Sequence, residues 1–269
     1  EMCIRDRCPL SSRDDKIVVV QYFTMPRYSS IPLTGGVKKG SVFILAVFIC
    51  ILHWLDVECH VISRLPPVVV LPGILCSRLW ATLENATDAP LYCPRNSKLY
   101  NIWVSDSQIL RPPCFYNRMV TTLNHSTCVH NSPGVKIGPV GYGNMSGCNC
   151  LNPEGPGPTL NVFSKMTNTL KSYGYIPGQN LKAVTYDWRL FGDPCFTPRL
   201  FEEIKDMIET SYDLNGGTPV VTLCHSMGCP ILHKFFVSKS KEWKDTYVSQ
   251  FINICGPFAG AAHSIVEFI

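Results

Sequence analysis

From residue 67 onward, short apolar runs alternate with segments in which apolar residues recur every three or four positions. Four runs are typical of strands buried on both faces: Pro67–Leu71, Leu181–Tyr186, Pro219–Leu223 and Phe251–Ile254. Between the strands, apolar positions within three segments predict amphipathic helices: 160–173, 200–208 and 231–236. Strands and helices that alternate at these lengths predict an α/β fold, in which a mostly parallel sheet carries helices on both faces.

Residues 75–158 interrupt this alternation. Proline, glycine and cysteine are scattered through them, so we expect a cap or lid region with little regular structure. The same region contains three N-glycosylation sequons, none with proline in the middle position, at Asn85, Asn124 and Asn144.

An earlier apolar block, Ser41–Leu55, follows Lys38 and Lys39. It is shorter than the roughly 20 residues of a membrane-spanning helix and matches the apolar core of a signal peptide. We therefore interpret 25–62 as a signal peptide or signal anchor that starts at Met25, and 1–24 as a leader that need not be native. The alternative is that the block is a buried helix or strand.

The composition of the chain indicates the cellular compartment of the protein and argues against nucleic-acid binding and metal binding. With 46% hydrophobic and 16% charged residues, the chain fits a globular, somewhat lipid-facing protein. The net charge of +4 comes without a basic run or nucleic-acid motif, so no nucleic-acid partner is expected. The 14 cysteines show no zinc-type spacing, because Cys148-Asn-Cys150 is too close, and no metal is expected. Together with the predicted leader and the three sequons, the cysteines favour a location in the secretory pathway.

The sharpest chemical signal lies in Val220–Cys229, where an apolar strand runs into Ser226-Met227-Gly228 and an amphipathic helix follows. This is the context of a nucleophile elbow, the strained turn that presents a catalytic serine. It makes Ser226 the predicted nucleophile and the backbone N–H of Met227 a predicted oxyanion donor. Gly228 is the small residue that the turn needs, whereas Cys224 replaces the usual glycine two positions before the serine. The alternative is a chance match in a surface loop.

A second oxyanion donor should come from the loop after an earlier strand. Pro72-Gly73-Ile74 ends the strand at 67–71, so the Ile74 N–H is the candidate. The alternative is an ordinary turn at a strand end. His225 precedes Ser226, but an elbow directs its side chain elsewhere, and we do not assign it as the base.

Several motifs occur in one order along the chain: Pro67–Gly73, Cys93 with Cys114, Ile102-Trp103, Pro133–Ile137, Tyr186–Arg189, His225–Gly228, and Trp243–Asp245 followed by Gly256–Phe258. Each is weak alone. As an ordered set over roughly 66–265, they resemble the lecithin:cholesterol acyltransferase family, which includes lysosomal phospholipase A and phospholipid:diacylglycerol acyltransferase. The resemblance implies an α/β-hydrolase core with a cap and a mobile lid.

The resemblance also implies an activity. A lipid O-acyltransferase or phospholipase of this type moves a fatty acyl group from a phospholipid, through an acyl-Ser226 intermediate, to a sterol, a diacylglycerol, another alcohol or water. It needs no cofactor and works at a peripheral membrane or lipoprotein surface. The expected location is lysosomal or otherwise lumenal, or extracellular, with 41–55 as an anchor if the leader is retained. The alternatives are a hydrolase of small soluble esters and a non-catalytic lipid-binding relative.

Particular residues take roles from the same resemblance. Cys93 and Cys114 would form the disulfide of the lid loop, and Trp103 within that loop would face lipid. Asn124 falls where family members carry a glycan, and Tyr186–Arg189 looks architectural. Cys76 stands where relatives have glycine. The additional cysteines indicate further bridges of undetermined pairing: Cys128, Cys148, Cys150 and Cys195.

The aspartate and histidine of the Ser-Asp-His triad are expected after the last residue of this chain. His263 and Glu267 come too early in the topology to replace them. The chain stops within an apolar stretch at Phe268-Ile269. We therefore expect 63–269 to be an incomplete α/β-hydrolase domain, a fragment that is inactive alone.

Overall fold

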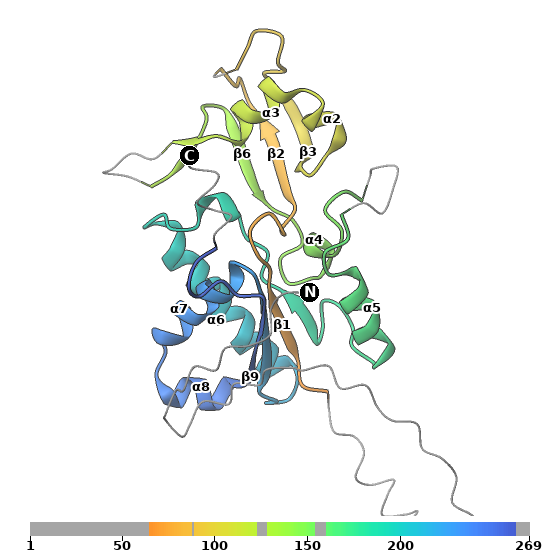
Figure 1. Ribbon diagram of the computed structural model, residues 1–269, viewed down its shortest axis with the longest axis vertical. Coiled ribbons are helices and arrows are strands. Elements are labelled where there is room, and N and C mark those ends of the chain that lie inside the picture. Colours follow the sequence, from red (N-terminus) through yellow and green to blue (C-terminus); the bar gives the residue numbers. More distant parts are fainter. Residues whose placement is uncertain (1–64, 88, 123–127, 154–159, 262–269) are drawn as a thin grey trace, which may run out of the picture. The chain divides into compact units, whose positions relative to one another are not determined.

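The computed structural model describes residues 65–87, 89–122, 128–153 and 160–261 (Figure 1). The predicted leader and anchor, the sequon at Asn124, and the residues His263 and Glu267 lie outside these ranges. None of the helices within them has the length and apolar character that a membrane crossing needs.

The centre of the fold is a four-stranded sheet in the order β7-β1-β8-β9, with every neighbouring pair parallel. Its strands are β1 (Val68–Leu71), β7 (Leu181–Ala183), β8 (Val220–His225) and β9 (Val248–Ile254). In the central strand, Val70 pairs with Ala183 on one side and Leu223 on the other. All four predicted strands are present, and the predicted α/β class is confirmed.

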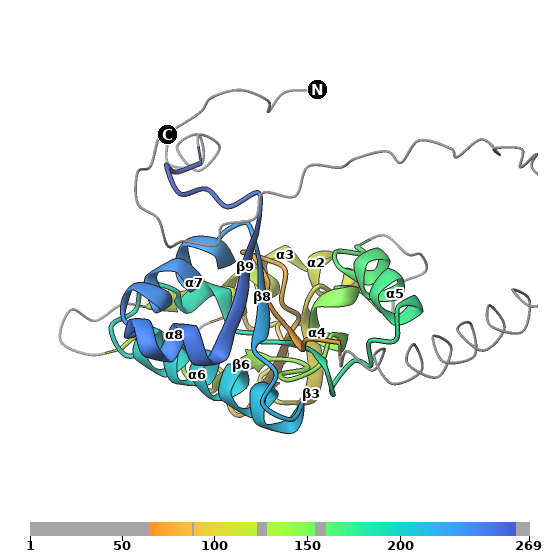
Figure 2. The same ribbon diagram turned by 90° about the horizontal axis from the view of Figure 1, so that it is seen from below.

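Helices cover both faces of this sheet, as Figure 2 shows. They are α5 (Ser164–Ser172), α6 (Phe196–Leu214), α7 (Gly228–Val237) and α8 (Lys241–Tyr247). Val69 and Leu71 pack with α6 and α7, whereas Val68 and Val70 pack with residues of α5. Alternate residues of β1 therefore belong to two different apolar cores, which is why the strand is apolar at every position.

The cap region is more regular than the sequence indicated, and the expectation of little regular structure was wrong. Three antiparallel strands form a second sheet in the order β3-β2-β6: β2 (Leu79–Leu83), β3 (Ser97–Trp103) and β6 (Val135–Pro139). Smaller elements surround them: α2 (Asp106–Ile109), α3 (Pro112–Met119), β4 (Thr121–Thr122), β5 (His130–Asn131) and α4 (Ser146–Asn149). Only one residue of β3, Ile102, is buried, so the strand lacks the alternation that marks a half-buried strand.

A buried ion pair connects the cap to the central sheet. Arg189 Nη2 lies 2.6 Å from Asp187 Oδ2, with both side chains almost fully buried. The same guanidinium donates to the carbonyl oxygen of Met119 at 3.1 Å and to Asn131 Oδ1 at 2.9 Å. These contacts fit the architectural role expected for Tyr186–Arg189.

Disulfides reinforce the cap. The structure joins Cys93 to Cys114, the pair that the resemblance implied, and joins Cys128 to Cys195 at the start of α6. Cys148 and Cys150, whose pairing the sequence left open, form no disulfide.

Candidate active site

Ser226 lies at the turn between β8 and α7. Its φ of 50° is in the left-handed region, which costs a non-glycine residue roughly 1–2 kcal/mol. Two hydrogen bonds hold this backbone: the Ser226 N–H donates to the carbonyl oxygen of Ile254, and its own carbonyl accepts from the N–H of Cys229, both at 2.9 Å. A strained serine between a buried strand and a helix is the geometry that the sequence predicted for the nucleophile.

Two glycines allow the chain to approach this turn closely. A Cβ on Gly228 would lie 2.5 Å from the carbonyl oxygen of Leu71 and 2.6 Å from that of Pro72. A Cβ on Gly73 would lie 2.7 Å from Cβ of Ser226. The C-terminal end of β1 therefore packs directly against the serine, and only glycine fits at either position.

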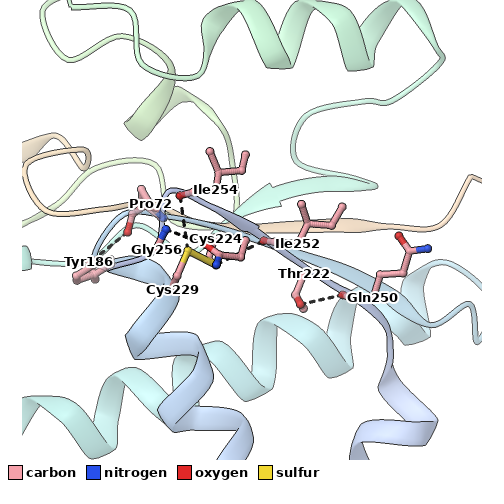
Figure 3. The surroundings of a disulfide bond; sticks show 10 residues. Pro72, Tyr186, Thr222, Cys224, Cys229, Gln250, Ile252, Ile254 and Gly256 are labelled. Atoms are coloured by element: carbon pink, nitrogen blue, oxygen red, sulfur yellow. Dashed lines mark hydrogen bonds between the residues drawn. A yellow bond between two sulfur atoms is a disulfide. The ribbon is translucent and has the colours of Figure 1, made fainter. Parts of the chain in front are cut away.

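A disulfide runs beneath the elbow and joins Cys224 to Cys229 (Figure 3). Both cysteines are fully buried. Their sulfur atoms lie 3.5 Å from the carbonyl oxygen of Ile252 and 3.9 Å from that of Ile254, both in β9. Cys224, which stands in place of the usual glycine, therefore directs its sulfur into a bond with the first turn of α7, a pairing that the sequence did not predict.

The turn after β1, Pro72–Ser77, stands beside Ser226 and carries the predicted second oxyanion donor. The N–H of Cys76 donates to the carbonyl oxygen of Gly73 at 3.2 Å, and Leu75 has a φ of 63°. Ile74 is 46% exposed. Gly73, which precedes Ile74, lies against Ser226, and Met227 follows the serine directly. The role of the Ile74 and Met227 N–H groups as oxyanion donors stays a prediction.

The side chain of His225 contacts Phe163 and Cys76. Its ring meets Phe163 edge to face at 5.7 Å, and its Nδ1 lies 3.9 Å from Sγ of Cys76. Burial lowers the pKa of His225 and raises the pKa of the Cys76 thiol. A thiol whose pKa is raised stays in its less nucleophilic protonated form, and the role of Ser226 as nucleophile stays a prediction.

Trp103 ends β3 instead of lying in an irregular loop. Its ring is half-buried, stacks with Phe115 at 6.4 Å and meets Trp188 edge-on at 5.2 Å. Its indole Nε1 donates to the carbonyl oxygen of Leu75 at 2.8 Å. Trp103 therefore contacts the turn Pro72–Ser77 directly, a contact that the sequence gave no sign of, and its contact with lipid stays a prediction.

The two described sequons differ in exposure. Asn85 is exposed, whereas Asn144 is half-buried and its Oδ1 accepts a hydrogen bond from the N–H of Ser146 at 3.0 Å. Asn85 is thus the better placed of the two to carry a glycan, and glycosylation of either stays a prediction. Among the described residues, no three histidine, cysteine or acidic side chains are grouped so that they could hold a metal ion.

Comparison with known proteins places this geometry in a family. Residues 99–269 match the sequence model described as lecithin:cholesterol acyltransferase. Lysosomal phospholipase A and acyltransferase from Homo sapiens is 30% identical over 208 residues, which are 76% of this chain and 49% of that protein. Phosphatidylcholine-sterol acyltransferase from Mus musculus is 28% identical over 200 residues, 72% of this chain and 44% of that protein. The chain thus spans about half the length of the curated relatives it matches. It belongs to the lecithin:cholesterol acyltransferase family.

Proposed function

We propose that the protein is a lipid O-acyltransferase and phospholipase that moves a fatty acyl group from a phospholipid, through an acyl-Ser226 intermediate, to an alcohol or water. One observation carries this proposal: Ser226 is held with a positive φ between β8 and α7 and packs against Gly73 of the turn after β1. An elbow serine beside a turn with free backbone N–H groups is the arrangement used for acyl transfer on this fold.

The chemistry proceeds in two steps. Ser226 Oγ attacks the acyl carbonyl while a base removes its proton, and the N–H groups of Met227 and Ile74 stabilise the oxyanion. The intermediate collapses, the lysophospholipid leaves with a proton returned by the base, and an acyl-enzyme remains. An acceptor hydroxyl or water then attacks this ester and regenerates Ser226.

The base is a histidine oriented by an aspartate, and we place both C-terminal to Ile269. His225 does not fit this role, because its ring packs on Phe163 and its Nδ1 faces Cys76.

A lipid surface as the source of substrate is supported by the cap. Six of its large apolar side chains are strongly exposed, at 50–86%: Leu91, Tyr92, Leu99, Leu110, Tyr116 and Val120. We propose that these side chains contact lipid, since contiguous exposed apolar surface marks sites of contact with lipid or protein. The two relatives are named for phospholipid and phosphatidylcholine chemistry. We infer peripheral binding to membrane or lipoprotein surfaces in the lysosome, another lumen or the extracellular space, with sterol, diacylglycerol, another alcohol or water as acceptor.

The test uses the protein translated from its complete transcript, incubated with phosphatidylcholine vesicles whose acyl chains carry an isotope label. We expect labelled lysophosphatidylcholine or fatty acid, and a labelled ester when a long-chain alcohol is added. Ser226→Ala should abolish all of these products. Ser238→Ala is the matched control, because its hydroxyl only donates to the carbonyl oxygen of Phe235 in α7.

Two results would favour the alternatives. Binding of vesicles without turnover or acyl-enzyme would identify a non-catalytic lipid-binding protein. Faster cleavage of a short-chain soluble ester than of phospholipid would identify an esterase of small substrates.

A further inference from the structure

Three aromatic side chains hold the turn Pro72–Ser77 by its carbonyl groups. Tyr186 Oη donates to the carbonyl oxygen of Pro72 at 3.0 Å, and Trp188 Nε1 donates to that of Ser77 at 3.2 Å. Trp103 Nε1 donates to the carbonyl oxygen of Leu75 at 2.8 Å. Tyr186 and Trp188 follow a strand of the central sheet, whereas Trp103 comes from the cap.

The hydrogen bond from Trp103 fixes the direction of the Ile74 N–H through two peptide groups. In a trans peptide the C=O and N–H point in opposite directions. Holding the Leu75 carbonyl therefore aims the N–H of Cys76, which donates to the carbonyl oxygen of Gly73 at 3.2 Å. Holding the Gly73 carbonyl in turn aims the N–H of Ile74.

The influence of Trp103 on the direction of the Ile74 N–H depends on the position of the cap. Trp103 belongs to the segment that the Cys93–Cys114 disulfide closes, and its ring packs between Phe115 of α3 and Trp188. Its hydrogen bond to Leu75 is exposed, so water competes for the carbonyl as soon as the ring moves. Leu75, at a φ of 63°, has no intrinsic preference for the conformation that the bond holds.

We propose that Trp103 is a positioning residue that completes the oxyanion site, so that the rate of acyl transfer depends on the placement of the cap segment 93–114. The proposal rests on the function proposed for Ser226. It differs from a role as a lipid contact, because it acts on the turnover of every substrate and not on the binding of a lipid surface.

Trp103→Phe removes the N–H and keeps an aromatic ring between Phe115 and Trp188. In the complete protein we expect kcat to fall about tenfold, a smaller loss than the hundredfold or more for a deleted oxyanion donor. The loss should be equal for phosphatidylcholine vesicles and for a short-chain soluble ester, with KM and vesicle binding unchanged. Benzothienylalanine at position 103, which replaces only the indole N–H by sulfur, should reproduce it even if phenylalanine disturbs the packing.

Trp243→Phe is the matched control. Trp243 lies in α8, and the substitution removes an indole N–H that donates to Glu209 Oε1 at 2.6 Å. It should leave kcat unchanged. If Trp103→Phe weakens vesicle binding or raises KM on vesicles while kcat on the soluble ester stays at the wild-type value, Trp103 is a lipid contact and the inference is wrong. An inactive wild-type protein would instead overturn the proposed function, and the inference with it.

Discussion

The nucleophile elbow and the turn that faces it are held by different kinds of contact. The elbow at Ser226 has two short-range links, because the Cys224–Cys229 disulfide spans five positions and the Cys229 N–H bonds to the serine carbonyl, and one bond from the Ser226 N–H to Ile254 in the adjacent strand β9. The turn Pro72–Ser77 is held by donors at 103, 186 and 188, separated from their acceptors by 28 to 114 positions. The elbow therefore combines local links with a contact inside the central sheet, whereas the turn depends on side-chain donors from the cap and from the segment after β7.

This difference predicts two kinds of mutational effect. Changes at the elbow should remove the reactivity of the serine, whereas changes to the donors of the turn should reduce it by degrees. Each variant below is made in the complete protein, and the reactivity of Ser226 is followed as the rate of fluorophosphonate labelling.

The largest effect is expected from Gly228→Ala. The new Cβ would lie 2.5 Å from the carbonyl oxygen of Leu71, so the elbow has to move away from β1. We expect labelling to be abolished and the free energy of unfolding to fall by about 1–3 kcal/mol, as for other overpacked sites. Denaturant titration measures the second quantity. Gly192→Ala is the control, because a Cβ at Gly192 has no atom within 4 Å; its positive φ of 98° makes the substitution strained locally, but Ser226 should label normally.

Gly73→Ala tests the contact between the two regions. Its Cβ would lie 2.7 Å from Cβ of Ser226. Because the turn must shift and carry the Ile74 N–H with it, we expect labelling to slow about a hundredfold, the loss typical of a missing oxyanion donor. Labelling at the wild-type rate would show that this turn contributes nothing to the site.

Removing disulfides separates local from global stabilisation. Replacing Cys224 and Cys229 together by alanine opens a loop of five positions and should cost about 2 kcal/mol of unfolding free energy, with labelling slowed about tenfold. Replacing Cys128 and Cys195 opens a loop of 67 positions and should cost about 4 kcal/mol, with labelling unchanged in the folded protein. If both pairs affect labelling equally, the elbow disulfide has no local role.

The smallest effect is expected from Tyr186→Phe. Burial raises the pKa of Tyr186, so its hydroxyl keeps the proton that it donates to the Pro72 carbonyl. Loss of this buried donor should lower the free energy of unfolding by about 1–3 kcal/mol. It should slow labelling of Ser226 only a few-fold, because Trp103 and Trp188 still hold the turn. Tyr142→Phe, whose exposed hydroxyl donates to the carbonyl oxygen of Glu203, should change stability by less than about 0.5 kcal/mol.

The same contrast explains what could be predicted from the sequence. The strands of the central sheet and the position of Ser226 follow from local apolar runs and from a strand that leads into a helix, and the structure contains them. Helix α8 was not predicted, because none of its seven residues is buried and it shows no apolar stripe. The cap sheet was missed for a related reason, since only Ile102 of β3 is buried and the strand shows no alternation of buried and exposed residues.

The supports of the turn could not be predicted at all. The family resemblance implied lipid contact for Trp103 within the segment that Cys93 and Cys114 close, and nothing in its sequence neighbours shows that it reaches the Leu75 carbonyl. The pairing of Cys224 with Cys229 was also hidden, because a glycine-like position two residues before a nucleophile does not indicate a disulfide. Hydrogen bonds and bridges of this kind depend on the assembled fold.

The most direct test of the account is peptide mass spectrometry of the complete protein after reaction with a fluorophosphonate. An acyl-enzyme mechanism at Ser226 predicts one adduct, on the peptide that contains Ser226, and its loss in Ser226→Ala together with all phospholipid turnover. An unmodified Ser226 in a preparation that still cleaves phosphatidylcholine, or an adduct on a different residue, would contradict it.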